Sequence, residues 1–251
     1  MNRVRGRKEG LKPLPHAAPR GVIGRLRFAT RLGLDLQVRT VHRDMRRFLP
    51  GLQGNVLDLG CGQSPYRYLL GPRARYIGLD FEGSRDFGYR DEPDVTYFDG
   101  STIPLDDGSI DHVLCTEVLE HVQEPEVLLQ EVYRVLRAGG TGVFTIPWSA
   151  RYHYIPHDYH RFTPSMLRIL FSTFSRVEVE PRGTDVAAIA SKVVVLAFRP
   201  LLGGDRGLIS VLRSAVLAPV AVVAAIIGQL SIALNIGSPD DPLGYTVWVA
   251  K

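Results

Sequence analysis

The sequence predicts a doubly wound α/β fold: a mostly parallel seven-stranded sheet, an antiparallel last strand and an apolar helical insert before that strand. Two observations support this prediction. After residue 50, short apolar segments alternate with helical ones, and parallel strands need such crossover connections. A long apolar stretch then separates the final strand-like segment from the others. A chain of 251 residues, 45% hydrophobic and 22% charged, is long enough for one such domain with additions.

Seven segments have the length and apolar content of strands. They are residues 55–59, 74–80, 95–99, 112–116, 141–146, 176–180 and 244–250. The sixth of these, RVEVE, alternates apolar and charged side chains, which is typical of an exposed strand.

Helical spacing of apolar residues fills most of the remaining chain. The predicted helices cover 21–49 (one or two basic amphipathic helices), a segment that starts near Ser64-Pro65, residues 125–137 and residues 163–171. Pro50-Gly51 is expected to end the first, and Gly139-Gly140 the helix over 125–137, because proline and glycine interrupt helices.

Charge is unevenly distributed along the chain. The first 50 residues hold 13 of the 30 basic side chains and 3 of the 26 acidic ones. A basic segment of this kind indicates binding to nucleic acid or to an anionic membrane surface, or it is a solvated tail that aids solubility. No apolar signal-peptide core precedes it, and the two cysteines form neither a disulfide framework nor a metal-binding spacing, so we expect a reduced, cytoplasmic compartment.

The apolar insert covers residues 185–238, and residues 214–239 carry no charge at all. Its second half is long enough to span the ~30 Å hydrocarbon core of a bilayer. A single crossing would leave the final strand on the wrong side, so the turn-like segment 199–207 favours a hairpin that enters a membrane shallowly and returns. The alternative is that these helices cover the domain or form a dimer interface.

The stretch VLDLGCGQSP, residues 56–65, predicts a strand that ends in a glycine turn. It lacks the third glycine of a dinucleotide-binding turn and the Lys-Ser/Thr of a phosphate-binding loop. Asp58, Asp80 and Asp99 end three successive predicted strands. Singly, each is an ordinary strand-end aspartate. Together they indicate a ligand with ribose hydroxyls, an adenine amino group and a positive charge, but no phosphate.

These segments, with YFDGSTIPLDDGSIDHVLCTEVLEHV and EVYRVLRAGGTGVFTIP, resemble the class I S-adenosylmethionine-dependent methyltransferases, in particular the small-molecule and ubiquinone/menaquinone-type subgroup. The resemblance covers about residues 50–180 and the last strand, and implies a Rossmann-like sheet with S-adenosylmethionine as cofactor. It places Asp58, Gly60 and Gly62 at the methionine end of the cofactor and Asp80 at the ribose. It also places Asp99 and Gly100 at the adenine, and Glu117 beside the methionine. Cys61 and Phe81 are included as their neighbours, and Ser64 stands where the family has a further glycine.

Methyl transfer from a sulfonium needs alignment more than acid–base groups, and only a poor nucleophile needs a base. The segment 148–162 gathers three histidines, an aspartate and three tyrosines, and resembles the family's segment at the acceptor pocket. From it we predict His157, His153 and Tyr159 as catalytic residues. Asp158 and Arg161 either serve the site or pair to fix the loop. Adjacent His157 and Asp158 point apart on an extended chain, so no metal site is predicted there. His121 is interpreted as structural or as a pocket wall.

The sequence thus predicts five parts: a flexible basic tail (1–20), a basic amphipathic helical segment (21–50), a cofactor-binding core (51–184), an apolar helical hairpin (185–238) and the core's final strand (239–251). The expected function is O-methylation of a lipophilic or lipid-linked small molecule at the inner face of the membrane, peripheral or monotopic, with oligomerisation possible. Two alternatives stay open: a soluble methyltransferase of small metabolites whose insert is a dimer interface or pocket lid, and a membrane-attached scaffold with a vestigial cofactor site. Nucleic acid is disfavoured as an acceptor because the body is acidic and an Asn/Asp-Pro-Pro-Tyr/Phe motif is absent.

Overall fold

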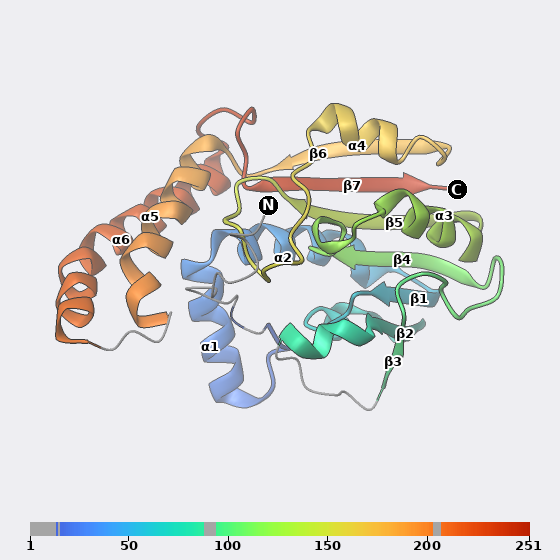
Figure 1. Cartoon of the computed structure of the whole chain (residues 1–251), viewed down its shortest axis with the longest axis horizontal. Helices are drawn as coiled ribbons and strands as arrows, with labels where there is room; N and C mark the ends of the chain where they lie inside the picture. Colours follow the sequence, from blue (N-terminus) through green and yellow to red (C-terminus); the bar gives the residue numbers. More distant parts are fainter. Residues whose placement is uncertain (1–13, 15, 88–93, 203–206) are drawn as a thin grey trace.

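The computed structural model describes residues 14, 16–87, 94–202 and 207–251, so most of the predicted flexible tail lies outside the described residues. Seven strands form one sheet (Figure 1). They are β1 (Gly54–Leu59), β2 (Ala74–Phe81), β3 (Val95–Phe98), β4 (Ile110–Thr116), β5 (Leu136–Pro147), β6 (Arg176–Arg182) and β7 (Gly244–Ala250). Each overlaps its predicted segment, and the ends differ by a few residues at most except at the start of β5.

The strand order is β3-β2-β1-β4-β5-β7-β6. Strands β1 to β5 are parallel to their neighbours, whereas β7 lies antiparallel between β5 and β6. The carboxyl ends of β1, β2 and β4 therefore meet at one edge of the sheet, where open sites of such folds lie. The predicted α/β fold with its antiparallel last strand is confirmed.

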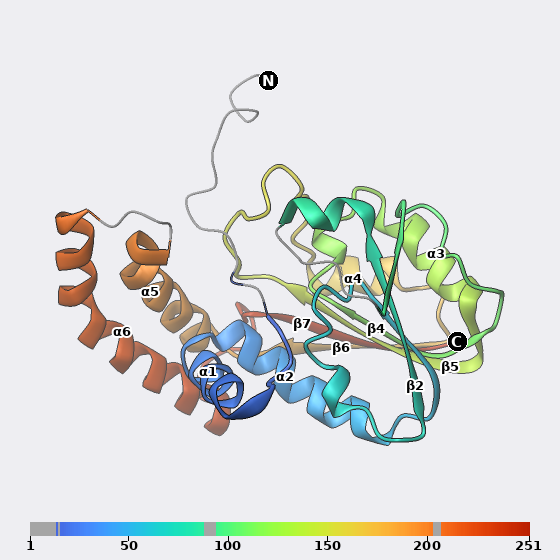
Figure 2. The same cartoon turned by 90° about the horizontal axis from the view of Figure 1, so that it is seen from below.

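Helices cover both faces of the sheet (Figure 2). On one face lie α3 (Pro125–Val135) and α4 (Pro164–Leu170), with the largest buried cluster between them and the strands. On the other face lies α2 (Leu36–Phe48), whose Val41 and Met45 pack with Val56 of β1 and Val143 of β5. Both faces of the central strands are thus buried, which is why those strands are apolar along their length.

The helix predicted near Ser64-Pro65 is wrong. Only a 3-10 turn, η2 (Arg67–Leu69), lies between β1 and β2. The connection is short, and the sheet face that a helix here would cover is occupied by α2, with Tyr66 buried against it. Helix α2, from the N-terminal segment, therefore covers the face of the sheet where the sequence predicted a helix after β1.

The expected stop at Gly139-Gly140 is also wrong. The helix α3 ends at Val135, and β5 begins at the next residue, so both glycines lie inside the strand. A Cβ on Gly140 would lie 2.9 Å from the carbonyl oxygen of Arg137 and 3.0 Å from that of Asp111. The glycine therefore permits close backbone approach within the sheet rather than ending a helix.

The predicted basic amphipathic segment forms two helices, α1 (Gly21–Leu34) and α2. Asp35 separates them and caps α2, because its side chain accepts a hydrogen bond of 3.1 Å from the Val38 amide. Pro50 and Gly51 lie in a 3-10 turn that follows α2, as expected from the sequence.

The insert forms an antiparallel pair, α5 (Asp185–Leu202) and α6 (Leu208–Leu234), beside the β6–β7 end of the sheet (Figures 1 and 2). Small side chains form the contact between these helices. They are Ala187, Ala190, Ala197, Ala221, Ala225 and Gly228. A Cβ on Gly228 would lie 2.9 Å from the Ala190 Cβ and 2.4 Å from Leu36 of α2. These small side chains let the two backbones approach closely, and Val194, Phe198 and Leu217 pack around the contact.

Candidate cofactor and acceptor site

The turn after β1 adopts left-handed backbone angles at alternate residues. The φ values are +72° at Gly60, +52° at Gly62 and +50° at Ser64. A Cβ on Gly60 would lie 2.4 Å from Val118 Cγ2, so this position accepts only glycine without rearrangement. Ser64 takes a glycine-like conformation, and its hydroxyl donates a 2.8 Å hydrogen bond to the Tyr76 oxygen, whose own proton goes to Asp58.

Two buried carboxyl groups lie against this turn. Asp58 accepts a 2.9 Å hydrogen bond from the Tyr76 hydroxyl, and burial, with a smaller contribution from Asp80, raises its pKa to about 7. Asp80 accepts from the amides of Gly62 (3.1 Å) and Phe81 (2.8 Å), and burial raises its pKa too. Within the described chain neither carboxylate forms an ion pair. A ligand with a positive charge and hydroxyl donors therefore fits these two acceptors.

The next two strand ends flank the same edge. The Phe81 ring packs on Phe98 with centroids 5.0 Å apart, and a Cβ on Gly100, whose φ is +88°, would lie 3.0 Å from Phe81. Asp99 is exposed, and its Oδ1 accepts from the amide and the hydroxyl of Ser101. Phe81 thus packs between Phe98 and Gly100, and Asp99, between those two residues in the chain, is exposed.

Glu117 follows β4 and is held by Arg182, a residue that the sequence analysis did not single out. Arg182 is completely buried, and its guanidinium donates to Glu117 Oε1 at 2.6 Å. It also donates to Thr40 of α2 and to the carbonyl oxygens of Ile146 and Tyr245. Glu117 itself has a φ of +55°, so the ion pair fixes a strained residue beside the glycine turn.

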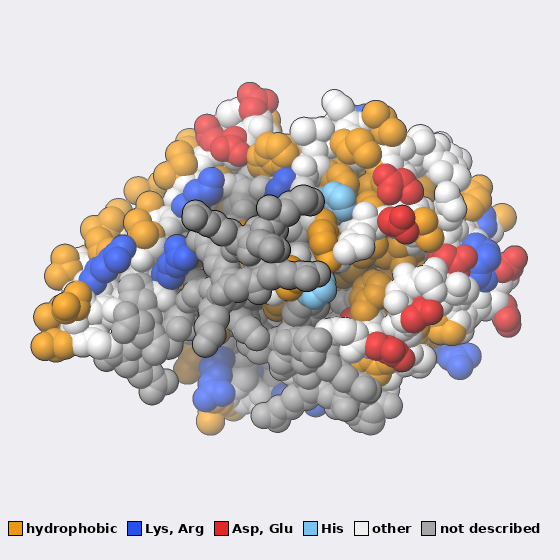
Figure 3. Space-filling view, in the orientation of Figure 1, with side chains coloured by type: hydrophobic (Ala, Val, Ile, Leu, Met, Phe, Trp, Pro, Cys, Tyr) orange, Lys and Arg blue, Asp and Glu red, His pale blue; other side chains and the backbone are white. Residues whose placement is uncertain are grey.

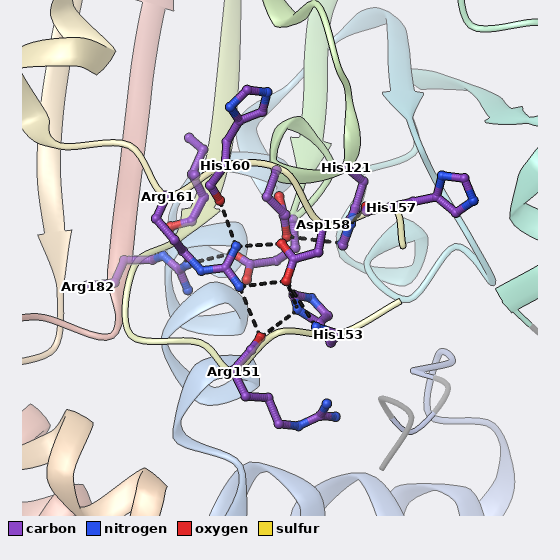
Figure 4. Close-up of polar contacts among 11 residues, drawn as sticks. His121, Arg151, His153, His157, Asp158, His160, Arg161 and Arg182 are labelled. Carbon is purple, nitrogen blue, oxygen red and sulfur yellow. Dashed lines mark hydrogen bonds and ion pairs between the residues drawn. The ribbon is translucent and has the colours of Figure 1, made fainter. Parts of the chain in front are cut away.

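The loop after β5 is organised by Asp158 and Arg161 (Figure 4). Arg161 donates to both carboxylate oxygens of Asp158, at 2.6 and 2.8 Å, so these residues form the pair that was one of the two alternatives left open by the sequence. Burial opposes ionisation of Asp158, but hydrogen bonds from His153 and Arg161 outweigh it and hold the pKa of the carboxyl well below its usual range.

The three predicted catalytic residues fall into two groups. His153 turns toward Asp158, with 3.0 Å between its Nδ1 and Asp158 Oδ2. His157 and Tyr159 are exposed and hydrogen-bonded to each other at 3.0 Å, and the His157 ring points away from Asp158 (Figure 4). The structure therefore brings His153, but neither His157 nor Tyr159, into the Asp158–Arg161 network.

A further group at this edge was missed. Glu120 is completely buried, and burial raises the pKa of its carboxyl. Its neighbour His121 contacts His153 edge to face, with ring centroids 4.9 Å apart. Burial, and then the positive charge that His153 can carry, lower the pKa of His121 to about 4. Residues 121 and 153 lie 32 positions apart in the chain, and no local sequence pattern links them.

Comparison with known proteins agrees with this geometry. Residues 57–144 match a family model described as a methyltransferase domain. A probable S-adenosylmethionine-dependent methyltransferase of Mycolicibacterium smegmatis is 32% identical over 97 residues, which are 37% of this chain and 38% of that protein. The thiol S-methyltransferase TMT1B of Homo sapiens is 38% identical over 108 residues, which are 38% of this chain and 44% of that protein. This chain thus spans less than half the length of either relative.

Among solved structures, a SAM-dependent methyltransferase from Archaeoglobus fulgidus superimposes with a TM-score of 0.52 at 18% identity, over 90% of this chain and 99% of that one. At this identity the likeness concerns the fold. Fold, glycine turn, strand-end acids and family match together show that the chain contains a class I S-adenosylmethionine-dependent methyltransferase domain. The resemblance to this family seen in the sequence, and S-adenosylmethionine as the cofactor that it implied, are confirmed.

Proposed function

We propose that this protein transfers the methyl group of S-adenosylmethionine to a lipophilic small molecule at a membrane surface. The observation that supports methyl transfer is that Asp58 and Asp80, beside the glycine turn, have no basic partner among the described residues. The ribose hydroxyls can donate to Asp80, and the cofactor's positive charge offsets the burial of Asp58. Cys61 and Gly62 complete the proposed turn at the methionine end, with Glu117 opposite them.

Binding of S-adenosylhomocysteine, measured by calorimetry on the purified chain, tests this part. We expect Gly60→Ala and Asp80→Asn each to weaken binding at least ~10-fold. Alanine at position 60 disfavours the left-handed backbone conformation of the turn, and asparagine at position 80 replaces the carboxylate that accepts from the ribose hydroxyls. Asp107→Asn is the matched control, because its side chain is 80% exposed and it precedes β4, whereas the proposed site lies at the carboxyl ends of the strands. A wild-type protein that does not bind the ligand contradicts the proposal, and full activity in Asp80→Ala would favour the scaffold alternative.

The proposed membrane surface is the outer side of α5 and α6. The helix α6 is long and apolar enough to cross a membrane by length and composition, and only 22% of its most apolar window is buried. The side chains it exposes are large and apolar, and they include Ile209, Val216, Val223, Ile226 and Leu230. A core helix of a soluble protein would bury most of these.

Helix α1 adds a basic, amphipathic element. It has no buried residue, and it exposes Val22, Ile23 and Leu26 next to Arg25 and Arg27. In the view of Figure 3, hydrophobic and basic side chains share the hairpin end of the molecule, and acidic ones lie over the sheet and near the base of the hairpin. Apolar area together with basic charge is the pair of signals that stable peripheral anchoring needs.

The hairpin leaves the sheet after β6 and returns as β7, which pairs with β6. Both ends of the insert are therefore fixed on one side, which fits shallow insertion from the cytoplasmic face rather than a single crossing. Flotation with vesicles that contain anionic lipid tests this, with neutral vesicles and 0.5 M salt as controls. A chain that stays with the aqueous fraction and sediments as a dimer would instead support the soluble alternative, in which the insert is a dimer interface.

The accepting atom is proposed to be oxygen, because His153 oriented by Asp158, or the His157–Tyr159 pair, can take a proton from a hydroxyl. The names of similar proteins include a thiol S-methyltransferase and a ubiquinone/menaquinone biosynthesis C-methyltransferase, so sulfur and carbon are tested alongside. Incubation with methyl-labelled S-adenosylmethionine and either a lipid extract or a soluble extract distinguishes the acceptor classes. Label that enters only the soluble extract contradicts a lipophilic acceptor.

A further inference from the structure

Three metal-ligating side chains meet at the carboxyl ends of β4 and β5. Glu120 and His121 belong to a 3-10 turn that follows β4, η4 (Leu119–His121), and His153 lies in the loop after β5. One ligand atom from each of the three lies within 4.8 Å of the other two. Glu120 lies three residues after Glu117 in the chain. His153 contacts Asp158, which pairs with Arg161 (Figure 4).

The carboxylate of this cluster lacks the partners that a buried carboxylate needs. Glu120 has no exposed surface, and neither of its oxygens accepts a hydrogen bond from the described residues. His121 Nε2 lies 3.5 Å from Oε1, which is too long for a hydrogen bond of ordinary strength. Burying an unpartnered carboxylate is costly, so its position points to a ligand that it binds.

Both histidines are oriented as metal ligands are. His121 Nδ1 lies 2.5 Å from the carbonyl oxygen of His157. His153 Nδ1 lies 3.0 Å from Asp158 Oδ2 and 2.9 Å from the carbonyl oxygen of Arg151. These oxygens only accept, so each Nδ1 carries the proton and each Nε2 presents its lone pair. A histidine whose second nitrogen donates to a carboxylate or a carbonyl is the usual arrangement around a protein-bound metal.

We propose that Glu120, His121 and His153 bind a divalent transition-metal ion, with Zn²⁺ as the ion that this donor set suits. Two imidazoles and one carboxylate favour zinc over magnesium or calcium, which prefer oxygen ligands throughout. Three protein ligands leave one position of a tetrahedral site open. Tetrahedral bonds of about 2 Å put ligand atoms about 3.3 Å apart, so the three ligand atoms, which lie within 4.8 Å of one another, draw closer when the ion binds.

The site gives Asp158 and Arg161 a definite role. Arg161 fixes the Asp158 carboxylate, and Asp158 fixes the ring of His153, so both are positioning residues for the ion. The site also changes the interpretation of His153, because a ring that uses its Nε2 as a ligand does not act as a general base. Metal binding does not depend on methyl transfer, so the two proposals can fail separately.

The test uses the full chain, stripped with a chelator and dialysed. Zinc is titrated by calorimetry, bound zinc is counted by elemental analysis, and Co²⁺ is added as a spectroscopic probe. We expect one zinc per chain and the intense visible absorption of tetrahedral Co²⁺. Glu120→Gln and His153→Ala should each weaken zinc binding at least ~100-fold, and Asp158→Asn, which removes only the orienting carboxylate, ~10–100-fold.

His157→Ala is the matched control, because it removes a histidine of the same loop and leaves the carbonyl that His121 uses. It should keep zinc affinity within about twofold of the wild type. Circular dichroism and denaturant unfolding check that each variant is folded, and His153→Ala on the loop stands in if Glu120→Gln does not fold. A wild-type chain that takes up no zinc, as a protonated Glu120 would predict, overturns the proposal. So does an equal loss of zinc in His157→Ala, which would indicate adventitious binding by histidines.

Discussion

The sheet and the α5–α6 hairpin bury opposite kinds of side chain. The sheet encloses large ones, such as Leu57, Phe144 and Phe171, and it surrounds charged groups with hydrogen-bond partners. The hairpin encloses mainly alanines and a glycine, with Val194, and exposes many of its large aliphatic side chains. Removal of apolar area from water therefore stabilises the sheet, whereas the hairpin is held by close backbone approach. Four predictions test this difference, from the largest expected effect to the smallest.

Replacing the buried charge of the sheet should have the largest effect. Arg182→Met leaves Glu117, Thr40 and two carbonyl oxygens without their donor, and removal of one partner of a buried ion pair costs about 3–5 kcal/mol. Because the Glu117 side chain is 30% exposed and can be hydrated, we expect a loss of about 3 kcal/mol in the free energy of unfolding, measured with denaturant. Arg176→Met, at the exposed start of the same strand, should change it by less than about 0.5 kcal/mol. Equal effects in both variants would show that Arg182 is not a buried anchor.

Adding one methyl group to the hairpin contact should come second. Gly228→Ala places a Cβ 2.4 Å from Leu36 Cδ1, and overpacking costs about 1–3 kcal/mol, from which about 1 kcal/mol of improved helix propensity is subtracted. We expect a net loss of up to about 2 kcal/mol by thermal or denaturant unfolding. Gly33→Ala in α1, where no atom lies within 4 Å of the added carbon, should stabilise instead. A stabilising Gly228→Ala would mean that the seam is looser than the structure shows.

The stability of the protein should depend on pH through the buried carboxyl group of Asp58 in β1. Burial raises the Asp58 pKa to about 7, above its unfolded value, so between about pH 4 and 7 the native state holds a proton that the unfolded state has lost. The free energy of unfolding of the ligand-free protein should therefore fall as pH rises through this range, by on the order of 1 kcal/mol per unit. Asp58→Asn should flatten the slope. A profile identical in wild type and Asp58→Asn would assign the titration elsewhere.

The smallest effect on stability is expected on the outer face of the hairpin. Ile226→Ser replaces a side chain that is 54% exposed, and such substitutions change unfolding free energy by about 0.5 kcal/mol or less. The same change should weaken vesicle binding severalfold, because it removes apolar area from the proposed membrane contact. Asp107→Asn serves again as the control. Unchanged flotation in a multiple variant of the outer face would exclude this face as the anchor.

Local periodicity was enough to predict the seven strands and the hairpin, because each has its own apolar pattern and its own terminating residues. It was not enough for the segment after Gly62, since α2, some 20 residues upstream, occupies the face that a local helix would cover. The site divides in the same way. Asp58, Asp80 and Gly60 lie at strand ends that the sequence marks, whereas the pairing of Glu117 with Arg182 and of His121 with His153 joins residues 65 and 32 positions apart. No periodicity records such contacts. They depend on strand order and on the path of the loop after β5.

Arg182 has a mechanical consequence. It stands three residues before α5, at the point where the hairpin leaves the sheet, and its guanidinium is bonded to the cofactor-edge Glu117 and to Thr40 of α2. The residue that connects β6 to the hairpin is therefore fixed by hydrogen bonds, and is not part of a flexible linker. Helix α2, the Glu117 loop and strands β5 and β7 all accept from this one guanidinium, so displacement of Arg182 strains every one of these bonds at once.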